Sequence, residues 1–236
     1  MRIKSTGKCA YCDGVFSRQA MGRHLATCRG KQAELAPAPQ RRAATAKVFH
    51  LFVEGDGLPE YWMHLEAPAR ITLKDFDAFL RRTWLECCGH LSAFTIDGRR
   101  FNHVQFDDER EDFFRNTFVG VPKDRDMNVA LADALRAGLR FEHEYDFGST
   151  TALKLKVVAE YESAVKGKSI KVLSRNDPPP ISCGSCEQFA TQICSMCMSE
   201  EEGWLCDECA ASHDCEEDYF LPLVNSPRAG VCGYEG

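Results

Sequence analysis

Eight residues in the last quarter of the chain constrain its fold more than any other feature. They form three Cys-x2-Cys pairs and one His-x-Cys pair within 33 residues: Cys183 and Cys186, Cys194 and Cys197, Cys206 and Cys209, and His213 and Cys215. A Cys-x2-Cys turn presents two thiolates at the angle that tetrahedral Zn2+ requires, so eight such residues predict two sites of four ligands. The intervening sequence is too poor in apolar residues to build a core. Metal bonds must therefore supply much of its folding free energy.

The pairing of these ligands has more than one solution. Disulfides between the same cysteines are the alternative found in small secreted modules, but the paired spacing favours metal. The order of the pairs resembles B-box and related cross-braced zinc modules. That arrangement assigns one ion to Cys183, Cys186, Cys206 and Cys209, and the other to Cys194, Cys197, His213 and Cys215. Cys232 is a further thiol that could replace Cys215.

A second metal motif lies at the start of the chain, at Cys9, Cys12, His24 and Cys28. Ser17 can cap a helix that carries His24 and Cys28 four residues apart on one face. The stretch resembles the zinc-finger family with two Cys and two His ligands. It differs in having Cys as the fourth ligand and a central gap one residue shorter. We expect zinc here as well, which makes about three structural Zn2+ ions per chain.

Charge is distributed very unevenly along the sequence. Residues 1–47 have a net charge of +8, whereas residues 181–236 have a net charge of −10. A basic start and an acidic end predict different partners. DNA or RNA could bind the N-terminal region, and a protein could bind the acidic tail. One finger reads only about three base pairs, so a structural or protein-binding finger is an equal alternative. The candidate nucleic-acid contacts are Arg18, Gln19, Arg23, Arg41 and Arg42.

Hydropathy predicts a protein of the cytoplasm. Hydrophobic residues make up 44% of the chain, as in a globular protein. No run of about 18 apolar residues is present to span a membrane, and the first residues contain no hydrophobic signal region. A reducing compartment keeps thiols available to metal, and eleven of the 13 cysteines lie in the two terminal regions.

The middle of the chain predicts a single α+β domain with a mostly antiparallel sheet and a few packed helices, flanked by zinc-stabilised modules. A helix begins at the N-cap Thr72, with Asp75 three residues on, and ends at Gly89. The strands are expected at 48–53, 61–66, 91–96, 101–106, 141–147, 151–158 and 168–173, with a second helix at 127–137. The predicted organisation is a finger (1–29), a linker (30–46), the domain (47–175), a Pro-rich linker (176–182) and the two-zinc tail (183–236).

One hairpin of this domain carries alternating charges. A three-residue loop after Phe147 would pair Glu144 with Lys154 and place Phe147 on the apolar face. Glu142, Glu144 and Asp146 would then share the opposite face. Three such carboxylates could chelate Mg2+ and activate a phosphodiester. Alternating acids opposite lysines are also the ordinary surface of a half-exposed hairpin.

Several motifs of the central domain identify a resemblance. Leu58-Pro59, Ala67-Pro68-Ala69, Ile71-Thr72-Leu73 and His90-Leu91 recur in order, and Glu144–Gly148 is the most distinctive motif. These resemble the Ri-plasmid ORF-3-like family, found with plasmids and insertion elements. The resemblance implies a compact α+β domain in a prokaryotic cell. Its resolvase label implies nothing here, because no nucleophilic Ser amid arginines is present. The acidic residue, Trp and His that usually follow the motif are replaced at Ser149, Thr150, Thr151 and Leu153.

Two functions therefore compete. The first is a non-catalytic zinc protein whose closed four-ligand sites stabilise modules for binding nucleic acid or protein. The alternative is a metal-dependent enzyme that acts on nucleic acid through Glu142, Glu144 and Asp146. The adjacent Cys87 and Cys88 are expected to be buried thiols at a helix end, although such a pair can also form a redox site.

Overall fold

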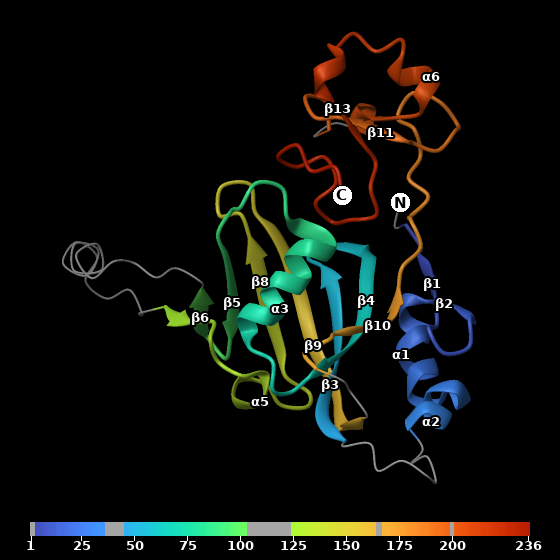
Figure 1. Ribbon diagram of the computed structural model, residues 1–236. Coiled ribbons are helices and arrows are strands. Elements are labelled where there is room, and N and C mark those ends of the chain that lie inside the picture. The colour runs from blue at the N-terminus through green and yellow to red at the C-terminus, as the bar shows by residue number, and fades with distance from the viewer. Residues whose placement is uncertain (1–2, 36–44, 103–123, 164–166, 199–200) are drawn as a thin grey trace, which may run out of the picture.

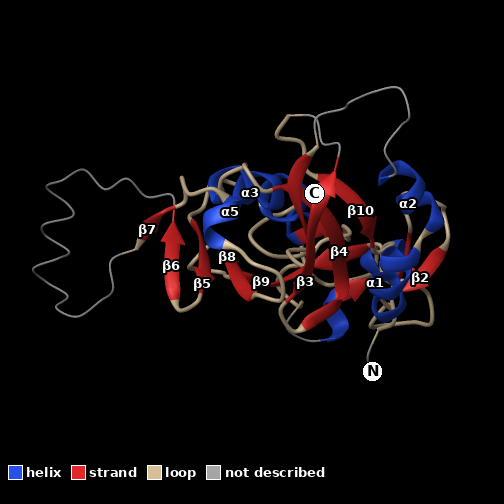
Figure 2. Cartoon of the chain, turned by 90° about the horizontal axis from the view of Figure 1, so that it is seen from below, coloured by secondary structure: helices blue, strands red, loops and turns tan. Residues whose placement is uncertain are grey.

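The computed structural model describes residues 3–35, 45–102, 124–163, 167–198 and 201–236. Its centre is an eight-stranded sheet with the strand order β10-β4-β3-β9-β8-β5-β6-β7, which can be followed across Figure 2. Every neighbouring pair in this sheet is antiparallel except β6 and β7. The predicted α+β fold with a mostly antiparallel sheet is confirmed. The strands are β3 (Ala46–Gly55), β4 (Leu58–Pro68), β5 (Ser92–Ile96), β6 (Arg99–Asn102), β7 (Arg125–Asp126), β8 (Arg140–Tyr145), β9 (Thr151–Ser163) and β10 (Lys171–Arg175).

The sheet is buried on both faces at its β10-β4-β3 end. Side chains alternate along each strand, so Met63 enters the main core together with residues of the helix α3 (Leu73–Leu80), whereas its neighbour Trp62 belongs to a separate cluster on the opposite face. Figure 1 shows α3 lying on one face of the sheet. Trp62 contacts Met21 and Leu25 of the N-terminal helix α1 (Arg18–Thr27). The N-terminal module therefore forms a third layer on the central domain.

The helix α3 begins where its sequence predicted. Asp75 N donates to Thr72 Oγ1 at 3.1 Å, and Thr72 N donates to the Asp75 carboxylate at 3.0 Å, which completes a capping box. The chain continues as a π-helical turn, Arg81–Leu85, which buries Trp84 completely. Thus the apolar stripe that covers the sheet continues from the α-helix into the π-helical turn.

The hairpin β8–β9 has a different register from the predicted one. Its loop contains five residues, 146–150, and Glu142 lies opposite Lys154 while Tyr145 lies opposite Thr151. The loop is longer because Asp146 adopts a left-handed backbone (φ 63°) and its carboxylate accepts from the N–H of Gly148 and Ser149. A shift of two residues keeps each β8 side chain on its predicted face. Phe147 lies outside the strand and is exposed, which corrects its expected place on the apolar face.

Other elements differ from the expected ones in extent. The helix predicted at 127–137 is reduced to the four residues of α5 (Leu131–Ala134). Asp126 accepts from Asn128 N in a tight turn, and residues 127–131 instead exchange backbone hydrogen bonds with residues 71–74. The strand predicted at 168–173 begins three residues later, as β10. Most of the strand predicted at 101–106 falls outside the described residues.

A helix replaces the first part of the predicted linker. The helix α2 (Arg29–Leu35) follows α1 directly. The Lys31 ammonium lies 4.6 Å from the centre of the Tyr161 ring, and Lys171 pairs with Glu34 at 2.6 Å. These contacts with β9 and β10 hold the segment on the domain, whereas its own Ala- and Gly-containing sequence has no apolar period.

The tail forms a small module beyond the end of the sheet (Figure 1). Its sheet has the order β12-β11-β13. The elements are β11 (Gln192–Cys194), β12 (Trp204–Leu205), α6 (Asp207–Ala210) and β13 (Phe220–Pro222), with 3-10 turns at Glu201–Gly203 and Glu217–Tyr219. The first strands of the chain, β1 (Thr6–Lys8) and β2 (Val15–Ser17), pair with each other in the N-terminal module.

Asn176 lies where the three parts of the protein meet. Its side chain accepts from Trp62 N at 2.8 Å and donates to Asn225 Oδ1 at 2.7 Å, and Asn225 donates back to the Asn176 carbonyl. The Asn176 backbone also bridges to Gly7, and the N–H of Asp177 donates to the Thr6 carbonyl at 2.7 Å. A Cβ on Gly7 would lie 2.2 Å from the Arg175 carbonyl oxygen, so only glycine allows this approach.

Two buried histidines make the domain sensitive to acid. His50 Nε2 and His64 Nδ1 form a hydrogen bond of 2.9 Å, and both side chains are almost fully buried. Burial lowers the pKa of His50 to about 3 and that of His64 to about 4, with the nearby Lys31 adding to both shifts. Protonation is thus resisted in the folded state but occurs freely in the unfolded chain.

We expect His50→Gln to reduce the loss of stability on acidification. Stability is fully present above the ordinary histidine pKa of about 6.5 and is lost as pH falls toward the lowered folded value. Between about pH 7.5 and 5.5 the wild type should lose about 1 kcal/mol more than the variant. Denaturant unfolding followed by tryptophan fluorescence at both pH values measures this difference. Parallel losses in the two proteins would contradict it.

Candidate metal centres

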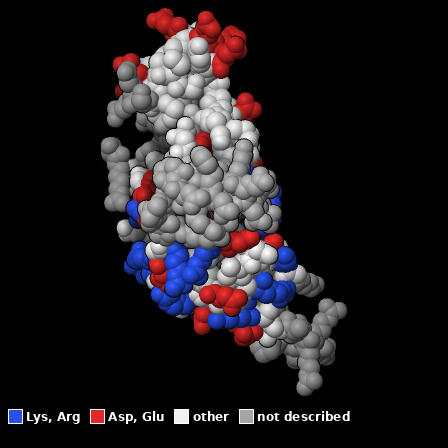
Figure 3. All heavy atoms as spheres, turned by 90° about the vertical axis from the view of Figure 1, so that its left-hand side faces the viewer, with Lys and Arg blue, Asp and Glu red and all other residues white. Residues whose placement is uncertain are grey.

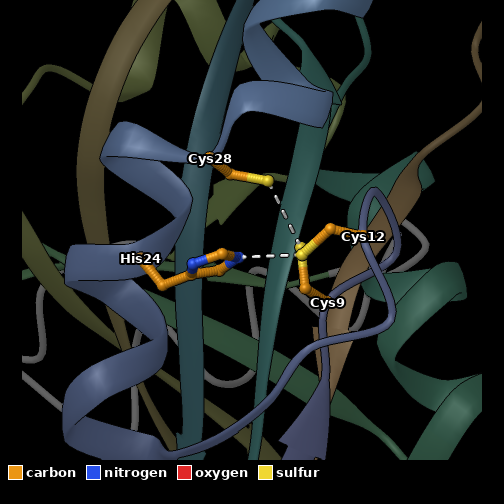
Figure 4. Close-up of side chains that lie close together, drawn as sticks. All are labelled: Cys9, Cys12, His24 and Cys28. Atoms are coloured by element: carbon orange, nitrogen blue, oxygen red, sulfur yellow. Dashed lines mark hydrogen bonds between the residues drawn. The ribbon is translucent and has the colours of Figure 1, made fainter.

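The N-terminal group joins a turn to a helix. Cys9 and Cys12 lie in the turn between β1 and β2, while His24 and Cys28 come from the end of α1 (Figure 4). Their four ligand atoms all lie within 4.8 Å of one another. Cys9 Sγ is 3.9 Å from Cys28 Sγ, and Cys12 Sγ is 3.3 Å from His24 Nε2. The Phe16 ring stacks on His24 with centroids 3.9 Å apart, which fixes the imidazole toward the sulfurs.

This group is attached firmly to the central sheet. Trp62 Nε1 donates to Ser5 Oγ at 2.8 Å, and Ala10 N donates to the Leu173 carbonyl at 2.9 Å. The backbone N–H of Lys31 donates to the Cys28 sulfur and lowers the pKa of that thiol. Cys28 therefore loses its proton more readily than an ordinary cysteine, and the thiolate is the form that binds metal.

The candidate nucleic-acid contacts do not form a single exposed face of one helix. Arg18 is half-buried and forms an ion pair with Glu54 of β3. Gln19 and Arg23 are exposed and border a hollow that Phe52 and His64 also line. Arg41 and Arg42 fall outside the described residues. The central domain thus occupies part of the surface that a DNA groove would need.

The tail holds two groups with interleaved ligands. Cys183, Cys186, Cys206 and Cys209 form one, and Cys194, Cys197, His213 and Cys215 form the other. Cys186 and Cys206 are 3.6 Å apart at their sulfurs, and Cys197 and Cys215 are 3.7 Å apart. This is the cross-braced grouping. Cys232, the alternative to Cys215, belongs to neither group.

Sulfur atoms occupy the interior of the tail module. Its buried cluster contains Cys183, Cys194, Leu205 and Cys206, with only one residue that is not a cysteine. Burial opposes ionisation of Cys183, but the backbone N–H groups of Ser185 and Cys206 donate to its sulfur and lower its pKa to about 6. His213 Nε2 is buried and has no hydrogen-bond partner within the described ranges. Thiolates and an unpaired imidazole nitrogen fit a metal ion that prefers S and N ligands.

The three carboxylates of the alternative enzyme site are separated. Glu144 pairs with Arg100 at 2.7 Å, Glu142 lies opposite Lys154, and Asp146 turns into the loop to pair with Arg228 at 2.7 Å. They do not appear together among the groups of described residues that could hold a metal. The left-handed turn at Asp146 takes its side chain off the strand face, which corrects the expected shared face.

A fourth group was missed by the sequence analysis. Cys87, Cys88, His90 and Cys232 also place their ligand atoms within 4.8 Å of one another. Cys88 is exposed and Cys87 is half-buried, so neither is the fully buried thiol that was expected. The Cys-Cys-x-His spacing after a helix was a usable signal, but the fourth ligand lies 142 residues from His90.

The family model for plasmid pRiA4b ORF-3-like proteins matches residues 49–205. The chain belongs to that family. The match covers the central domain and extends into the tail as far as β12. Among solved structures, the chain is similar to a protein of unknown function from Methanosarcina mazei Go1, with 18% sequence identity and a TM-score of 0.43. The match covers 55% of this chain and 71% of that one. No curated protein matches. Within the described residues of this family member, no helix is long and apolar enough to cross a membrane.

We expect Cys12→Ser to remove one metal equivalent from the N-terminal group, because the serine hydroxyl is a poor substitute for a thiolate ligand. Native mass spectrometry of the full chain should show one ion fewer per chain than the wild type. Thr27→Ala, an exposed change on the same helix, is the matched control and should keep the full number. Equal metal content in Cys12→Ser and wild type would contradict this assignment.

Proposed function

We propose that this protein is a non-catalytic, zinc-binding interaction protein. Its central sheet carries two small modules whose folds depend on structural Zn2+ at the three predicted groups. The observation that carries the proposal is the composition of those groups, each of which offers four thiolate or imidazole ligands. Four protein ligands close a tetrahedral zinc site and leave no position for a reacting water. The ions then stabilise folds and perform no chemistry.

A protein partner of basic character is the best match for the tail module. Acidic side chains gather at this end of the molecule (Figure 3), and residues 181–236 have a net charge of −10. Phe189 and Met196 of the module are large apolar side chains that are 64% and 61% exposed. Exposed apolar groups amid acids favour a partner segment with both basic and apolar residues. Nucleic acid would be repelled here.

The zinc assignment is tested by X-ray absorption at the zinc edge on the full-length protein. We expect a first shell dominated by sulfur at about 2.3 Å with a minor nitrogen contribution at about 2.0 Å. Zinc should be present in stoichiometric amounts after purification under reducing conditions. A shell with a coordinated water oxygen, or the absence of a stoichiometric transition metal, would contradict closed structural sites.

The partner assignment is tested with an array of basic, apolar-containing peptides and with duplex DNA. We expect peptide binding that weakens with salt and that falls at least several-fold in the double variant Phe189→Ser/Met196→Ser. Leu58→Ser removes an exposed apolar side chain from the central domain and should bind as the wild type does. Equal binding by all three proteins would contradict the tail as the site. If the protein bound DNA but no peptide, and Arg23→Glu abolished that binding, the binding site would instead lie in the N-terminal module.

A further inference from the structure

The fourth Cys and His group brings together the central domain and the end of the chain. Cys87 and Cys88 come after Glu86, the C-cap of the π-helical turn, and Gly89 (φ 81°) turns the backbone so that His90 folds back toward them. Cys232 comes from the C-terminal segment, which returns from the tail module to the central sheet (Figure 1). Its own backbone is left-handed (φ 53°), a conformation uncommon for a residue with a side chain. Both loops are thus shaped to aim their side chains at one point.

The distances within this group match those of a tetrahedral metal site. Cys88 Sγ is 3.0 Å from His90 Nε2 and 3.9 Å from Cys232 Sγ, and His90 Nε2 is 3.3 Å from Cys232 Sγ. Cys87 Sγ is 3.5 Å from Cys88 Sγ. Zinc–sulfur bonds of about 2.3 Å place two sulfurs of a tetrahedron roughly 3.8 Å apart. The N-terminal group shows the same spacing, with 3.9 Å between sulfurs and 3.3 Å between sulfur and nitrogen.

Tyr145 and Glu86 hold the ligand loop in this shape. The Tyr145 hydroxyl accepts from the backbone N–H groups of Cys87 and His90, at 3.4 and 3.3 Å, and donates to Glu86 Oε1 at 3.0 Å. Glu86 in turn accepts from Gly89 N at 2.6 Å and pairs with Arg81. These bonds order the backbone that carries three of the four ligands. Ligands held in position by surrounding hydrogen bonds bind metal more tightly.

Arg228 supplies the charge that such a site needs. Its side chain is fully buried and donates to Cys87 Sγ at 3.4 Å and to the Asp146 carboxylate at 2.7 Å. The Asp146 carboxylate also lies 3.4 Å from His90 Nε2. Three thiolates, one imidazole and a divalent ion carry a net charge of −1, and Asp146 adds a second negative charge. The Arg228 guanidinium contacts both Cys87 and Asp146 and offsets one of these two charges. Arg228 also bonds to Ser149 and Thr151, so it anchors the segment that delivers Cys232.

We propose that Cys87, Cys88, His90 and Cys232 bind a fourth Zn2+ ion. This ion fastens the C-terminal segment to the central domain, because three of its ligands come from one part and the fourth from the other. The site is independent of the three groups predicted from the sequence, since it shares no ligand with them. Its ligand set of three thiolates and one imidazole selects a borderline-soft divalent ion over Mg2+ or Ca2+.

Two measurements on the full-length variant Cys232→Ser test this site. Native mass spectrometry with metal analysis should show one zinc fewer per chain than the wild type. Hydrogen exchange should be several-fold faster in residues 225–236 and unchanged in the N-terminal module. Cys12→Ser is the matched control: it also loses one zinc but should leave exchange in residues 225–236 as in the wild type. Cys232 is exposed, so its replacement leaves no buried cavity.

Three results would overturn the fourth site while leaving the other three intact. The first is equal zinc content in Cys232→Ser and wild type. The second is a lost ion accompanied by accelerated exchange only in residues 183–222, which would place Cys232 with the tail groups. The third is a disulfide between Cys88 and Cys232, or between Cys87 and Cys88, in zinc-replete protein purified under reducing conditions.

Discussion

Sulfur atoms from separate stretches of the chain lie close enough to share an ion at both ends of this protein, and in the tail module they form most of the buried cluster. Among the described residues of the tail module, Ile193 and Leu205 are the fully buried large aliphatic side chains, so burial of apolar surface cannot by itself offset the entropy of ordering about fifty residues. Under the proposed function, coordination to a shared ion supplies what is missing. Folding would then depend on the supply of metal and on a reducing environment, because only a free thiolate coordinates. The central domain differs, since its own apolar cluster is extensive.

The N-terminal module is part of the architecture rather than an appendage. Its helix α1 buries Met21 and Leu25 against Trp62 and Leu173. An antiparallel sheet often leaves one face exposed to solvent, but here the strands that carry Trp62 and Leu173 are covered on both faces. This position explains why a finger-like sequence need not read DNA: one of its basic residues, Arg18, already pairs with Glu54. Membership of the family fixes the fold of the centre and leaves function to the sites attached to it.

Most of the features that could be predicted from the sequence depend on patterns of residues close together in the chain. Cys-x2-Cys turns and the Thr72/Asp75 capping box depend on residues a few positions apart, and both lie in the structure as expected. Features set by distant residues were missed. The Asp146 turn that lengthens the loop after β8 is held by Arg228, 82 residues away. The helix α2 is held by Lys31 over Tyr161, and the group at Cys88 needs Cys232. No periodicity within a segment reports such contacts.

The position of Asn176 has a consequence for how the protein unfolds. Its hydrogen bonds reach the sheet at Trp62, the first strand at Gly7 and the tail at Asn225, and the residue is almost fully enclosed. If one of these neighbours moved away, the buried polar group of Asn176 that it contacts would be left without a hydrogen-bond partner. Each such unpaired group costs about 1–3 kcal/mol of stability. The three parts are therefore bound into one cooperative unit. Complete melting should therefore proceed as a single event instead of piece by piece, although a local change at one extremity leaves the opposite one folded.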